Sequence, residues 1–163
     1  MDGYGKFDFS AHQTVNYRSP FWSYFRQVKR RIGGKGESVS ILFSNVIRCA
    51  ANAKDGFTLW SIPEADRNRY LQWQSGLLRT ELAELQPTLI FFVTGPYYDD
   101  HLRSELSDLT FEQLAGFEPR QFSKLRSVAL PAPAYRTYHP GYLNRHTSSL
   151  GFAPFKAAVA DAI

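Results

Sequence analysis

Apolar residues recur at helical spacing directly after Ser19-Pro20, which predicts a helix there. Serine caps the free amide groups at a helix start, and proline is preset for the first helical position. Gly33-Gly34 is typical of a helix end. The apolar side chains expected on the buried face of this helix are Phe21, Phe25, Val28 and Ile32.

A second helical pattern covers residues 66–86. It stops at Gln86-Pro87, since the residue before a proline disfavours helical backbone. Trp73 and Leu77 widen its apolar stripe. The stripe itself consists of Leu71, Leu78, Leu82 and Leu85.

Two short apolar runs predict buried strands, at residues 39–43 and 88–94. The second run is rich in β-branched and aromatic residues and ends at Gly95-Pro96. A strand, a helix and a strand at this spacing indicate a right-handed crossover within a parallel sheet.

Shorter elements fill the last third of the chain. Residues 99–106, 111–117 and 154–163 favour helices, and residues 127–130 and 135–138 favour strands. The pattern predicts one domain over 1–163, with an irregular segment over 1–18. The expected fold is a three-layer α/β/α sandwich with a short, mainly parallel central sheet.

Composition is that of a globular protein. Of the 163 residues, 44% are apolar and 15% are aromatic, which is enough for a core. The lone Cys49 excludes an internal disulfide and an all-cysteine metal site. No apolar run is long enough to span a bilayer and no signal segment opens the chain, so a cytoplasmic protein is expected.

The net charge of +4 is modest and fits two interpretations. One is solubility, and the other is a polyanionic partner met by clustered basic residues. Acidic residues gather elsewhere, around residues 81–84 and 99–108. The first basic cluster is Arg26, Lys29, Arg30, Arg31 and Lys35, and the second is Arg120, Lys124, Arg126, Arg136 and Arg145.

Three candidate site residues follow predicted strands. Asn45 follows the run over 39–43, Gly95 follows the run over 88–94, and His139 follows the last short strand. Ligands of such folds bind beyond the carboxyl ends of parallel strands. The amide of Asn45 could pair with the edge of uracil or cap a turn, and His139 could donate to a leaving group or hold a turn.

Each of the other candidate contacts also has a purely structural interpretation. Tyr97 could stack on a base or pack in the fold. Leu143 could enter a base stack as a wedge or lie in the core. Arg136 and Arg145 could contact phosphate or solvate the surface. No histidine pair has metal-ligand spacing, so neither a metal nor another cofactor is expected.

The order of these motifs resembles the uracil-DNA glycosylase superfamily, most closely its bacterial branch. The resemblance rests on Asn45-Val46-Ile47-Arg48-Cys49, on the strand that ends at Gly95, and on Tyr138-His139-Pro140-Gly141, with Ser19-Pro20-Phe21 before them. It covers residues 19–145. It implies a catalytic His139, a base-binding Asn45, Gly95 and Tyr97, a DNA-binding Leu143, Arg136 and Arg145, and DNA as partner.

The chain departs from the family pattern at two points. The glycine-rich first motif, which positions the attacking water, is missing before Ser19, and Cys49 alone cannot hold the iron–sulfur cluster of some members. Three hypotheses follow. The protein excises uracil; it binds nucleic acid without excision; or it is a truncated form whose exposed core is covered by homo-oligomerisation.

Overall fold

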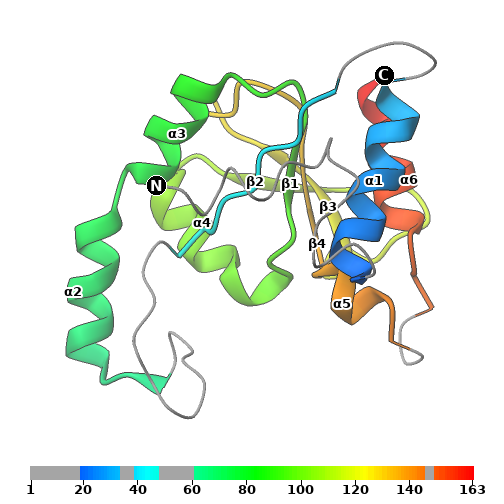
Figure 1. Ribbon diagram of the computed structural model, residues 1–163. Helices are drawn as coiled ribbons and strands as arrows, with labels where there is room; N and C mark the ends of the chain where they lie inside the picture. The colour runs from blue at the N-terminus through cyan, green and yellow to red at the C-terminus, as the bar shows by residue number, and fades with distance from the viewer. Residues whose placement is uncertain (1–18, 34–38, 48–60, 146–148) are drawn as a thin grey trace.

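The computed structural model describes residues 19–33, 39–47, 61–145 and 149–163. The segment over 1–18, Lys35 and Cys49 lie outside the described residues. The described elements form a mixed α and β domain with one four-stranded sheet (Figure 1). Among the described residues, no helix has the length and apolar character needed to cross a membrane.

The sheet is mixed, which corrects the expectation of a mainly parallel one. Its strand order is β1-β4-β3-β2. Only β1 and β4 run parallel, whereas the β4–β3 and β3–β2 pairs are antiparallel. The strands are β1 (Ile90–Phe92), β2 (Thr110–Gln113), β3 (Phe122–Arg126) and β4 (Ala134–Thr137).

The predicted strand over 39–43 is wrong. The predicted crossover between it and the strand over 88–94 is therefore wrong as well. This segment is irregular, and Leu42 and Phe43 are 69% and 39% exposed. A strand needs a neighbour for its backbone groups, and among the described strands β1 pairs with β4 alone. The apolar side chains instead pack individually, with Ile41 and Val46 at the margins of two different core clusters.

Helix α1 (Pro20–Ile32) confirms the first prediction. The Ser19 side chain accepts the Trp22 N–H at 3.3 Å, so the serine caps the helix as expected. Gly33 ends it, with its N–H bonded to the Lys29 carbonyl. Phe25 and Val28 lie on the buried face.

The single helix expected over 66–86 is two helices, α2 (Glu64–Gln74) and α3 (Leu77–Leu85). Gly76 separates them with φ of +83°, a conformation that favours glycine. The Glu105 carboxylate accepts the Gly76 N–H at 2.9 Å and stabilises the start of α3. The break turns the Trp73 side chain to solvent, where it is 78% exposed.

Two assignments in the last third also change. Residues 110–113 form edge strand β2 rather than a helix, because they pair with β3. Residues 127–130 form a turn, in which the Asp108 carboxylate accepts the Ser127 hydroxyl and the Val128 N–H. Helices α4 (Asp99–Glu105) and α6 (Ala153–Ala162) confirm the predicted ones.

Helices cover both faces of the sheet, giving three layers (Figure 1). Ile90 and Phe92 of β1 pack toward α3 and α4. The residue between them, Phe91, packs toward α1 and α6, and its ring lies 5.0 Å from that of Phe155. This alternation is the period-2 pattern of a strand buried on both faces.

Candidate functional site

The carboxyl ends of β1 and β4 meet at one edge of the sheet because the two strands run parallel. The Gly95 N–H donates to the Thr137 carbonyl at 2.9 Å and extends this pairing past the end of β1. His139 follows Thr137 by two residues. The structure therefore brings the Gly95 and His139 segments together, as the sequence predicted.

His139 begins the short helix α5 (Pro140–Leu143). Its Nδ1 accepts the Gly141 N–H at 3.0 Å, so the neutral ring carries its proton on Nε2. One face of the ring stacks on Phe21, with centroids 5.2 Å apart, while the residue as a whole is exposed. This partial burial lowers the pKa of His139 below its ordinary value of 6.5 and favours the neutral imidazole.

Aromatic rings line the same edge. Phe43 contacts Phe21 edge-on at 5.1 Å, and Phe21 stacks on His139. On the other side, Tyr138 and Tyr142 have ring centroids 4.6 Å apart. We call these five residues the aromatic rim. The rim consists of two groups of rings in contact, Phe43–Phe21–His139 and Tyr138–Tyr142, which meet in the chain at Tyr138 and His139.

Gly95 makes room for the rim. A Cβ at this position would lie 2.9 Å from Cδ1 of Tyr138, closer than side chains tolerate. Its backbone, at φ 64° and ψ −177°, also belongs to a region that is essentially restricted to glycine. The glycine is thus explained by close approach of the Tyr138 ring.

Asn45 lies in the irregular segment rather than at a strand end. It is exposed, and it stands two residues beyond Phe43 of the rim. Its position at the sheet edge therefore depends on side-chain packing of Phe43 and Val46, not on strand pairing. The structure gives no contact that joins Asn45 to His139 directly.

Tyr97 lies in the short 3-10 helix η3 (Pro96–Tyr98), directly after Gly95. Its side chain is 71% exposed. It is available for stacking, in keeping with its predicted place at the edge.

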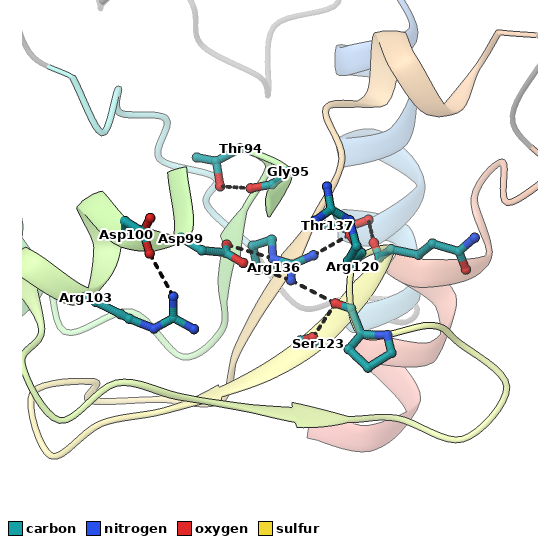
Figure 2. Close-up of polar contacts among 11 residues, drawn as sticks. Thr94, Gly95, Asp99, Asp100, Arg103, Arg120, Ser123, Arg136 and Thr137 are labelled. Atoms are coloured by element: carbon teal, nitrogen blue, oxygen red, sulfur yellow. Dashed lines mark hydrogen bonds and ion pairs between the residues drawn. The ribbon is translucent and has the colours of Figure 1, made fainter. Parts of the chain in front are cut away.

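Arg136 corrects the prediction of a phosphate contact. It is 2% exposed, and its Nε lies 3.1 Å from Oδ1 of Asp99. It also donates to the carbonyl oxygens of Arg120 and Pro119, at 2.7 and 2.8 Å (Figure 2). Burial lowers the pKa of the Arg136 guanidinium, and burial raises the pKa of Asp99 against the opposing charge of Arg136. The side chain is a buried structural cation.

Leu143 corrects the prediction of an exposed wedge. It is 1% exposed and packs in the core cluster of α1 and α6. The exposed ring of the same helix is Tyr142, which sequence analysis missed. The sequence signal for Tyr142 was its place directly before Leu143, since a helix that buries Leu143 turns the preceding residue outward. Arg145, two residues beyond Leu143, is exposed as expected.

A second polar cluster, also missed, lies where α4 meets the corner between α2 and α3. The Gln74 amide lies 3.4 Å from Nε2 of His101, and Glu105 is buried four residues after His101. Burial lowers the pKa of His101, against the opposing effects of Glu105 and the Val46 backbone. The i,i+4 spacing of His101 and Glu105 was the available signal. No group of three or more potential metal ligands occurs in the described part of the chain.

Replacing Arg136 by alanine is expected to lower the free energy of unfolding by about 3–5 kcal/mol, because Asp99, whose side chain is only 16% exposed, would lose its ion-pair partner. Urea-induced unfolding measures this change. Arg145→Ala is the control, since an exposed arginine should contribute less than about 0.5 kcal/mol. Equal losses for both variants would contradict the structural role of Arg136.

Gly95→Ala is expected to be more destabilising than Gly76→Ala. At Gly76 the left-handed backbone costs alanine about 1–2 kcal/mol, whereas the backbone of Gly95 lies in a region that is essentially restricted to glycine. At Gly76 the added Cβ meets open space, whereas at Gly95 it collides with Tyr138 and adds about 1–3 kcal/mol. Thermal unfolding of the two variants measures the combined effect of backbone strain and collision at Gly95, and equal stability losses would contradict it.

No family model, no curated protein and no solved structure matches the chain.

Proposed function

We propose that this protein is a uracil-DNA glycosylase-like protein that recognises a uracil-type base in DNA and hydrolyses its N-glycosidic bond. The observation that carries the proposal is the meeting of Gly95 and His139 at one sheet edge, with Nε2 of His139 as a neutral donor. A planar base with carbonyl oxygens matches a rim of rings beside one N–H donor.

His139 has the central role in this chemistry. Hydrolysis joins the water oxygen to C1′ of the sugar and breaks the bond from C1′ to the base nitrogen. The base leaves with the bonding electron pair, so negative charge develops on its carbonyl oxygens. A donor fixed near such an oxygen stabilises the transition state by about 3–4 kcal/mol. The Gly141 N–H holds the ring of His139 in the tautomer that donates through Nε2.

Asn45 and Tyr97 have the selective roles. The Asn45 amide has both donor and acceptor groups, which can match the donor and acceptor edge of uracil. Phe43 connects its segment to Phe21, which in turn stacks on His139. Tyr97 supplies an exposed ring after Gly95 on which a base can stack.

Nucleic-acid binding without excision is the second candidate. It is favoured by the burial of Arg136 and Leu143, which leaves fewer groups to hold a flipped nucleotide. It is also favoured by the position of Asn45 on an irregular, exposed segment. The excision assay separates the two candidates.

Purified protein incubated with an oligonucleotide that holds one uracil should produce alkali-labile strands. His139→Asn should lower the rate by about 10²–10³-fold. Asparagine is a matched replacement because it can still cap α5 but has no imidazole donor. Intact strands at high enzyme concentration would reject excision, and equal rates for both proteins would reject the role of His139.

The excision rate should also depend on pH through His139. The pKa of this imidazole lies below the ordinary 6.5, so the ring is neutral at pH 7 and above. Acidification through the lowered pKa protonates Nδ1 and removes the acceptor of the Gly141 N–H. The rate should therefore be flat near neutral pH and fall in acid, with a midpoint below pH 6.5. A midpoint above that value would contradict the assignment; the His139→Asn profile should lack this step.

A further inference from the structure

We infer that the aromatic rim binds single-stranded DNA in preference to duplex, with one base stacked on Tyr142 and a neighbouring phosphate held by Arg145. The inference rests on the proposed function for the identity of the partner as DNA. It adds the form of the substrate and the contact residue Tyr142, and it assigns the predicted DNA-binding Arg145 to the phosphate next to the stacked base.

The stacking surface is built in layers. The Tyr138 ring packs against the Gly95 backbone, where a Cβ would be only 2.9 Å away. Tyr142 packs on Tyr138 at 4.6 Å and is 43% exposed. One further planar ring can therefore extend the stack outward. Supported tyrosines of this kind have little freedom to lose on binding, which favours affinity.

A cationic residue, Arg145, lies in the same turn of the chain, three residues after Tyr142. The Arg145 N–H donates to the Tyr142 carbonyl at 3.1 Å, so the two residues are fixed as neighbours in the chain turn. Arg145 is exposed, and no ion pair joins it to a described carboxylate. A base on the ring and a phosphate on the guanidinium are one nucleotide unit of a single strand.

The local charge also suits a polyanion. Two carboxylates begin α4 at this edge, Asp99 and Asp100, and each is paired with an arginine. Asp99 faces the buried Arg136, and Asp100 faces Arg103. The acidic charges near the rim are therefore balanced, and Arg145 adds a positive charge that they do not neutralise.

The burial of Leu143 and of Arg136 argues against duplex DNA as the preferred form of the partner. An enzyme that extracts a base from duplex DNA must pay for unstacking, and an apolar wedge in the stack offsets that cost. Leu143, the residue placed for such a wedge, is 1% exposed. Arg136, a predicted phosphate contact, is 2% exposed. A single strand already presents unstacked bases and needs neither residue.

Fluorescence anisotropy of the full-length protein tests this inference. The probes are one labelled oligonucleotide without uracil, used as a single strand and as its duplex, at low and at moderate salt. The single strand should bind about tenfold more tightly than the duplex, and more weakly as salt rises. Tyr142→Ala should weaken single-strand binding by about 5- to 150-fold.

Three variants sharpen the test. Tyr142→Phe keeps a ring and should bind more tightly than Tyr142→Ala. Arg145→Ala should weaken binding and reduce its salt dependence by about one counterion. Trp73→Ala is the control, because it removes an even more exposed ring (78%, against 43% for Tyr142) on α2, away from the rim, and should leave binding unchanged. Circular dichroism establishes that each variant is folded.

The outcomes separate this inference from the proposed function. Equal or tighter duplex binding, or a Tyr142→Ala variant that binds as the wild type does, would overturn the single-strand inference even if uracil is excised. Tight single-strand binding without uracil excision would support the inference and leave the binding-only candidate. Absence of binding to either probe at low salt would overturn both.

Discussion

The buried guanidinium of Arg136 is the interaction on which the rest of the sheet edge depends. It joins β4 to Asp99 at the start of α4 and to the carbonyl oxygens of Pro119 and Arg120 before β3. A buried charge must keep all of these partners, since the loss of any one leaves a buried polar group without a hydrogen bond and destabilises the fold. The segment from Gly95 to Asp99 is thereby fixed between the end of β1 and Arg136.

That constraint also positions His139. Because β4 is anchored by Arg136, the next residues, Thr137 and Tyr138, are placed against the Gly95 turn. The chain then enters α5, whose cap is His139 itself. Nδ1 of His139 serves both the fold and the proposed chemistry. It caps the helix, and by accepting this hydrogen bond it fixes the tautomer that donates through Nε2.

Local signals predicted part of this arrangement from sequence. The cap at Ser19, the helix from Asp99 and the strand before His139 follow from nearby residues, and the structure has them. The wrong predictions concern residues whose structure depends on contacts with distant parts of the sequence. The run over 39–43 has strand composition but no described partner, and β2 exists because β3 pairs with it. The sequence predicted Arg136 to be a surface cation, but it is buried because Asp99 faces it.

The same contrast explains why Tyr142 rather than Leu143 faces outward. The short helix α5 packs against α1, so one of its two large residues must enter the core that Phe25 and Phe155 form. Leucine is the cheaper residue to bury, because a buried tyrosine must also find a partner for its hydroxyl. Burial of Leu143 thus leaves the Tyr142 ring exposed against Tyr138, so the packing of the core decides which ring of α5 is available for the proposed stacking.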